Sequence, residues 1–310
     1  MADWGLIAIR FALYADLMLL VGLAAFPIHA LRVGERAEGQ ILSLTKILIF
    51  LAIFGVFLSL VGLLALIAAM TGTSIFGIDW ETSRSIIFET SIGTAWLVRM
   101  VALVTAFLAV VALAETNGRR LIIVAVAGAV ALSSLVWTSH AGATEGAVGS
   151  MHKASDIAHM LASAIWLGGI AAFVTMLRGP FDRLNGEHLA VAHRALDSFS
   201  LTGTICVAVI ILTGLINGQI LVGFSNIGSL SEGTYGRLFL LKLAFVSLML
   251  VLAAKNRWRL TPDLGLALSD GREAKAVIAL RVGLLMEASA AAIVLGLAAW
   301  LGTLEPAGNL

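Results

Sequence analysis

The sequence predicts an all-α polytopic membrane protein, a bundle of about eight transmembrane helices. Of the 310 residues, 60% are hydrophobic and only 13% are charged, whereas about 45–50% of an ordinary soluble domain is apolar. The mean hydropathy is +1.00. The apolar residues also fall in long runs, and about 20 of them are needed for a helix to cross a bilayer. Such runs are too long for barrel strands, so one helical bundle over residues 1–310 is expected.

Each element of this bundle is a run of apolar residues between short polar connections. The first run lacks the basic region and the short apolar core of a cleavable signal, so we expect it to be a retained span. Two connections contain candidate interfacial helices, Leu189–Leu196 and Leu264–Leu268. The expected spans are about Trp4–Leu31, Ile41–Met70, Thr94–Ala114, Leu121–Ser139, Ala154–Leu177, Phe199–Phe224, Leu238–Ala254 and Val282–Gly302.

Basic residues are concentrated in alternate connections, which predicts the orientation. By the positive-inside rule these connections are cytoplasmic, so both termini and the loop after His140 are expected outside. The basic residues of the odd connections are Arg32, Arg36, Arg119, Arg120, Arg178, Arg183, Arg194, Lys255, Arg257, Arg259, Arg272 and Lys275.

Several functional classes are excluded or disfavoured. A net charge of +1, spread over short loops, gives no argument for a nucleic-acid partner. A single cysteine, Cys206, allows no disulfide within the chain and no CxxC motif. The motifs of phosphate-binding loops, zinc proteases and serine hydrolases are missing. We therefore expect no catalytic residues and no enzymatic activity.

The strongest candidate site is a cluster of histidines. Three of the six histidines fall between residues 140 and 159. His152, Asp156 and His159 stand at helical positions i, i+4 and i+7, so they share one face, with His140 a loop away. Met151 and Met160 flank them. Imidazole suits copper, zinc, iron and nickel, whereas a thioether favours Cu(I), so this set of six residues predicts a copper site, with zinc as the next choice.

Other polar residues lie inside the expected spans and mark a candidate transport pathway, because ionisable groups at membrane depth are costly. Lys242 and Arg99 have an alternative explanation, snorkelling to head groups or structural pairing. Asp16 fits a pathway or a pair with a cation, and Glu287 fits a pathway or a tie between helices. The pathway candidates are Asn217, Lys242, Met286, Glu287 and Asp16.

Two sets of motifs resemble a known family. The central set is Ser139-His-Ala-Gly and His159-Met-Leu-Ala-Ser-Ala-Ile-Trp-Leu-Gly-Gly169. The second set, over residues 198–306, is Ser198-Phe-Ser, Leu212-Thr-Gly-Leu-Ile-Asn217, Thr234-Tyr-Gly-Arg-Leu-Phe-Leu-Leu-Lys242, Ala253-Ala-Lys-Asn-Arg257, Arg281 to Glu287, and Leu301-Gly-Thr-Leu-Glu-Pro306. Together they resemble the copper resistance protein D (CopD) family.

The resemblance implies a bacterial inner-membrane protein of eight spans that imports or handles copper in homeostasis or resistance. It also implies a partner, a small periplasmic copper-binding protein of the CopC type, which we expect to be a separate chain. Copper is thus the expected ion, in an oxidation state that remains open.

Two other functions stay open at this stage. One is a membrane cytochrome of the b561 type, in which pairs of histidines on facing helices hold haem. His140 or His152 with His159 supplies one outer pair, and His29 is the one inner candidate. The other is a copper sensor or scaffold that does not transport the ion.

Overall fold

The structure is a computed structural model that describes residues 3–37, 42–114, 118–179, 184, 186–223, 230 and 233–306. Within these residues, eight helices are long and apolar enough to cross a membrane, which confirms the predicted fold class. They are α1 (Trp4–Ala30), α3 (Thr45–Thr71), α5 (Ser91–Ala112), α6 (Gly118–Ser133, continued by the 3₁₀ turn η2, Ser134–Thr138), α8 (Gly146–Met176), α9 (Gly186–Leu221), α10 (Thr234–Lys255) and α12 (Glu273–Leu301).

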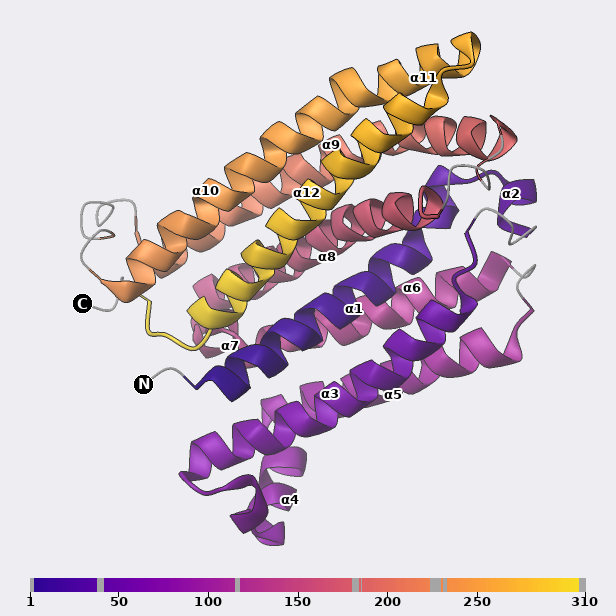
Figure 1. Ribbon diagram of the computed structural model, residues 1–310. Helices are drawn as coiled ribbons and strands as arrows, with labels where there is room; N and C mark the ends of the chain where they lie inside the picture. The colour runs from indigo at the N-terminus through magenta and orange to yellow at the C-terminus, as the bar shows by residue number, and fades with distance from the viewer. Residues whose placement is uncertain are drawn as a thin grey trace.

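Shorter helices join the spans (Figure 1). A π-helical turn, η5 (Asn256–Leu260), continues α10 into α11. Such turns often mark functional positions in helices. The remaining short elements are α2 (Val33–Ala37), η1 (Ile75–Gly77), α4 (Trp80–Glu89), α7 (His140–Ala143) and α11 (Thr261–Asp270).

Helix α1 lies in the middle of the bundle and joins its two halves. It packs against α3 and α6 of the N-terminal half and against α8 and α12 of the C-terminal half (Figure 1). Within the halves, α5 packs on α3 and α6, α9 packs on α8, and α10 packs on α12. The main hydrophobic core follows α1, with Leu17, Leu20 and Phe26 fully buried.

Two glycines allow α1 and α8 to touch through their backbones. A Cβ atom added at Gly168 of α8 would lie 2.2 Å from the Cα and carbonyl carbon of Gly22 in α1. A Cβ at Gly22 would lie 2.1 Å from the carbonyl oxygen of Ala164. Small residues permit this close approach of membrane helices, so the pair fixes where α8 sits on the central helix.

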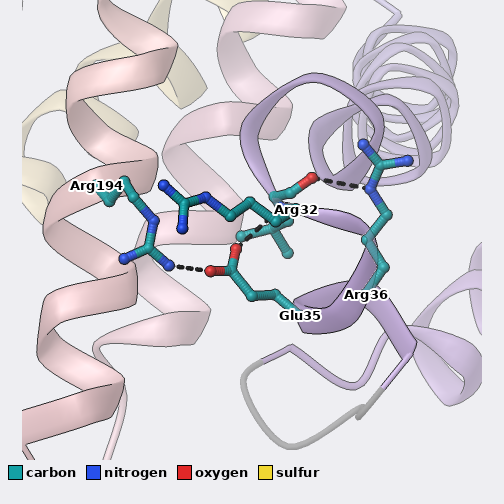
Figure 2. A network of polar contacts seen from close by, with 5 residues as sticks. Arg32, Glu35, Arg36 and Arg194 are labelled. Carbon is teal, nitrogen blue, oxygen red and sulfur yellow. Dashed lines mark hydrogen bonds and ion pairs between the residues drawn. The ribbon is translucent and has the colours of Figure 1, made fainter.

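The two ends of the bundle are tied by different contacts. At one end, which we call the termini end, the start of α1 meets the end of α12 and the ring centroids of Trp4 and Trp300 are 5.0 Å apart. At the opposite end, Glu35 of α2 forms an ion pair with Arg194 of α9 (Figure 2). The backbone N–H of Arg32 also donates to Glu35, at 2.9 Å. This contact links the two halves at the opposite end.

Some sequence-based boundaries are wrong. The predicted interfacial helix Leu189–Leu196 is the first part of α9, which begins at Gly186. His188, in the same polar stretch, is half-buried, and its Nε2 lies 2.7 Å from the carbonyl oxygen of Met176. Helix α8 begins at Gly146, about two turns before the predicted start. Two predicted span ends, Ile41 and Phe224, lie outside the described residues, and so does the basic residue Arg183.

Candidate metal-binding and transport site

The histidine cluster lies at the termini end, where η2, α7 and the start of α8 meet. His140 opens the four-residue helix α7, and His152, Asp156 and His159 lie on α8. Ser139 caps α7 by accepting the backbone N–H of Ala141 at 3.2 Å. The chain therefore turns back sharply from η2 into α8, and this turn brings His140 close enough to His152 and Asp156 to interact with both electrostatically.

His140 and His152 each have one ring nitrogen engaged by a protein acceptor. Nε2 of His140 lies 3.3 Å from the carbonyl oxygen of Leu301 in α12, so it donates and Nδ1 stays free. Nδ1 of His152 lies 2.9 Å from the hydroxyl of Thr144. That hydroxyl donates to the carbonyl of His140 at 3.1 Å, so it accepts from His152 and leaves Nε2 free.

His159 is oriented in the same way by α9. Its Nδ1 lies 2.9 Å from the hydroxyl of Thr213, which itself donates to the carbonyl of Val209 at 2.6 Å. The Thr213 hydroxyl therefore accepts from Nδ1, and Nε2 of His159 remains unprotonated. A metal-binding histidine usually donates its second N–H to such an acceptor. All three imidazoles are thus prepared to act as ligands.

Asp156 and Lys242 place opposite charges beside these rings. The hydroxyl of Ser139 lies 3.1 Å from Oδ2 of Asp156. The charge of Lys242 on α10 acts on both Asp156 and His159, and Asp156 also interacts electrostatically with His140. Lys242 is half-buried rather than extended freely into solvent. These contacts gather α7, α8, α9 and α10 around one polar cluster.

The two methionines occupy different surroundings. Met151 is 52% exposed on the outside of α8, whereas Met160 is 5% exposed within the main hydrophobic core. Among the described residues, no three His, Cys, Asp or Glu side chains lie close enough together to hold an ion as they stand. The cluster therefore does not form a complete metal site as these side chains stand.

Asn217 lies one helical turn beyond Thr213 on α9, toward the termini end. Its side-chain carbonyl oxygen is buried and has no hydrogen-bond partner among the described residues. A buried amide oxygen without a donor is unusual. It lies on α9, the helix whose Thr213 orients His159.

An apolar layer lies next to a second buried polar group, Glu287. The layer is formed by α8, α9, α10 and α12 and includes Ala162, Cys206 and Met249. Its core residues are Ala162, Trp166, Ile170, Cys206, Ile210, Met249, Ala290 and Ala291.

Glu287 of α12, which is 3% exposed, lies beside Trp166 of this layer. Its Oε1 accepts the indole N–H of Trp166 at 3.0 Å, and its Oε2 accepts the side-chain amide of Asn256 at 2.8 Å. Trp166 follows His159 by seven residues on α8, about 10 Å along the axis. Met286 is 51% exposed and lies on the outside of the helix. Glu287 therefore ties α8, α12 and η5 together.

Asp16 and Arg99 lie in the N-terminal half, away from this cluster. Asp16 is 3% exposed, and no cation among the described residues forms an ion pair with it. Arg99 is 5% exposed and its Nε donates to Ser134 at 3.0 Å. Arg99 therefore does not snorkel, because a snorkelling side chain keeps its charged group at the head groups, whereas this one is buried and bound to Ser134.

Comparison with known proteins identifies the family. The model for the copper resistance protein D-like N-terminal domain matches residues 1–150, and that for copper resistance protein D matches residues 193–301. A relative named copper resistance protein D, from Pseudomonas syringae pv. tomato, is 39% identical over 97% of this chain and 96% of its own. The chain belongs to the copper resistance protein D family.

Two further relatives extend the comparison. Inner membrane protein YebZ of Escherichia coli (strain K12) is 28% identical over 83% of this chain and 84% of its own. Copper transport protein CutJ of Bacillus subtilis (strain 168) is 28% identical over 55% of this chain and 31% of its own. No solved structure matches the chain. With eight apolar helices among the described residues, the chain is a multi-pass inner-membrane protein of a family named for copper resistance and transport.

Sequence reasoning missed the residues that orient the ligands. Thr144 and Thr213 each hold one imidazole, and Asn256 holds Glu287. Thr213 had a signal, because it is a polar residue one turn from Asn217 in an apolar run. Thr144 and Asn256 gave no such signal in the sequence, since the contact that each makes depends on how the chain turns at the end of a helix.

Proposed function

We propose that the chain carries copper across the inner membrane, taking the ion at the cluster of His140, His152, Asp156 and His159. One observation supports this more than any other. Three imidazoles at one end of the bundle each have one nitrogen tied to a protein acceptor, which leaves the second nitrogen for a metal. The family and the names of its relatives support copper as the ion.

The cluster faces the periplasm in this proposal. The basic residues at the opposite end, including Arg194 and Arg36, support that orientation by the positive-inside rule. Met151, exposed beside His152, is the soft ligand that an arriving donor meets first. We propose that the donor is a periplasmic copper-binding protein of the CopC type.

Before copper binds, Lys242 supplies the positive charge beside Asp156 and His159. Its ammonium group balances Asp156 electrostatically and acts on His159. A copper ion that binds these two ligands takes over the charge balance, so Lys242 has to move away. This exchange makes a weak, reversible site, which suits a carrier better than a storage protein.

The inward route passes Asn217 and then Glu287. The free amide oxygen of Asn217 lies on α9 near the entry cluster, and Glu287 is the next buried anionic group. The apolar layer around Cys206 borders Glu287 through Trp166. In this route the apolar side chains are the barrier, and Glu287 is the ligand at their edge.

The two alternatives have less support. Haem held by two imidazoles needs them on facing helices, whereas His152 and His159 share α8 and each is held by a threonine. A sensor or scaffold needs only the outer cluster. It leaves Asn217 and Glu287 without a role in copper handling.

Copper accumulation in cells tests the proposal. A double variant, His140→Ala with His159→Ala, removes two ligands and is expected to abolish the accumulation that the wild type supports. The matched control is His188→Ala with His193→Ala, which removes two imidazoles at the other end of α9. Unchanged accumulation in the first variant would show that the site assignment is wrong. Copper binding without uptake into proteoliposomes would instead favour a sensor.

A further inference from the structure

A second buried polar group lies in the N-terminal half, where α1 meets α3. Asp16 is 3% exposed and Ser59 of α3 is 1% exposed. Neither carboxylate oxygen of Asp16 has a hydrogen-bond partner among the described residues, and the same is true of the Ser59 hydroxyl. Buried polar groups are nearly always partnered. Two such groups on adjacent helices therefore indicate a ligand.

The sequence leaves a space for the Asp16 carboxylate. A Cβ atom at Gly55 of α3 would lie 2.6 Å from Oδ2 of Asp16 and 3.1 Å from Leu103 of α5. Ser59 follows Gly55 by one turn, and Arg99 precedes Leu103 by one turn on the antiparallel helix. Both therefore lie about 5.4 Å nearer the termini end than the carboxylate.

No charge balances Asp16 in this arrangement. Arg99 donates to Ser134 instead, and among the described residues the structure has no ion pair to Asp16. Asp16 points to α3, about 120° around α1 from Gly22, the residue that meets α8. Other titratable or charged groups lie on the helices packed around α1. They are Arg10, Tyr14 and His29 of α1, Lys46 of α3, Arg119 and Arg120 of α6, His152, Lys153, Asp156 and His159 of α8, Glu187, His188, His193, Arg194, Asp197 and Cys206 of α9, and Glu273, Lys275, Arg281 and Glu287 of α12.

We propose that Asp16 is a proton-binding site, and that its proton exchange drives copper movement at the separate outer cluster. A buried carboxylate with neither a donor nor a cation is costly, and a bound proton removes that cost. When the proton leaves to water, the Ser59 hydroxyl and the Arg99 guanidinium lie one turn away to hold the ionised form. The small residue Gly55 leaves room for that movement. The coupling, unlike the proton site, rests on the proposed copper transport.

A proton fits this site better than a metal cation does. A hard cation such as Ca²⁺ takes about 6–8 oxygen ligands. Asp16 and Ser59 together offer three side-chain oxygens. The cluster also contains the positive charge of Arg99 a turn away, which repels a second cation.

Infrared spectroscopy of the purified full-length protein tests the proton site directly. A protonated carboxyl group has a C=O stretching band that the ionised group lacks. The wild type is expected to show such a band that titrates with pH and is missing in Asp16→Asn. Asp3→Asn is the matched control, because Asp3 is an exposed N-cap on the same helix and asparagine keeps the cap. If wild type and Asp16→Asn give the same band at every pH, Asp16 binds no proton and the proposal is wrong.

Proteoliposomes test the coupling. Imposing a pH gradient is expected to accelerate copper uptake by the wild type and by Asp3→Asn. In Asp16→Asn the gradient should have no effect, while exchange of copper at equal concentrations continues. The coupling is wrong if the pH gradient accelerates copper uptake by Asp16→Asn as much as by the wild type. It is also wrong if a sodium gradient accelerates uptake by the wild type as well as the pH gradient does. If the wild type moves no copper at all, the proposed transport fails, and the infrared result still decides whether Asp16 binds a proton.

Discussion

Trp166→Phe tests how firmly Glu287 is held. The substitution removes the indole N–H that donates to Oε1 at 3.0 Å and leaves that oxygen without a donor in a residue that is 3% exposed. A buried acceptor left unpaired costs about 1–3 kcal/mol. The smaller ring adds roughly 1 kcal/mol of lost burial. We expect the free energy of unfolding to fall by about 2–4 kcal/mol.

Glu287→Gln should be much milder. The amide oxygen of Gln can accept one of the two donors, and its NH₂ group needs an acceptor. The side-chain oxygen of Asn256 is buried without a partner, so a flip of that amide supplies one. We expect a loss below about 1.5 kcal/mol, the net value of one hydrogen bond. Because the two substitutions touch one contact, the double variant should lose less than their sum.

The assay uses the single cysteine. Cys206 is 4% exposed, so a maleimide dye labels it only when the bundle opens. Thermal labelling of the wild type, the variants and Trp137→Phe gives the order of stability; Trp137 is 37% exposed and serves as the matched control. If Trp166→Phe is no less stable than Trp137→Phe, the hydrogen bond from Trp166 to Glu287 does not stabilise the bundle, and the reasoning is wrong. Glu287→Gln also separates the two roles of Glu287, a tie between helices and a ligand on the copper pathway. Loss of copper uptake with retained stability indicates the pathway ligand.

Two further substitutions test other contacts. Gly168→Ala puts a Cβ 2.2 Å from the backbone of Gly22, so α1 and α8 must separate by about 1.3 Å to reach ordinary contact. We expect a loss of about 1–3 kcal/mol in the same labelling assay, with Gly296→Ala, which meets open space, as the control; equal stability of the two variants would contradict the packing. Thr213→Val removes the acceptor of His159, so copper affinity by competitive titration should fall about 10–100-fold, and an unchanged affinity would show that His159 binds no copper.

Much of the fold was predictable because the membrane imposes one dominant rule. Apolar runs long enough to span are visible in the residues themselves, and the eight helices confirm them. Helix ends were less predictable, since α9 continues through the polar stretch after Gly186. There the exposed and buried sides alternate, with Leu189 buried and Ala190 exposed, and packing on α11 rather than lipid supports the helix.

The candidate site was predictable in part. Spacing alone places His152, Asp156 and His159 on one face of α8. What spacing could not give is the orientation of each ring, which depends on Thr144 across a turn and on Thr213 of another helix. Burial of Met160 in the core likewise depends on how α8 faces α1.

The most direct test of the central claim is the copper content of the purified protein. Wild type, the His140→Ala with His159→Ala variant, and the His188→Ala with His193→Ala control are loaded with copper, dialysed and analysed for metal, with Cys206 labelling to verify folding. We expect the wild type and the control to retain copper and the first variant to lose it. Equal copper in all three would contradict a copper site at the termini end.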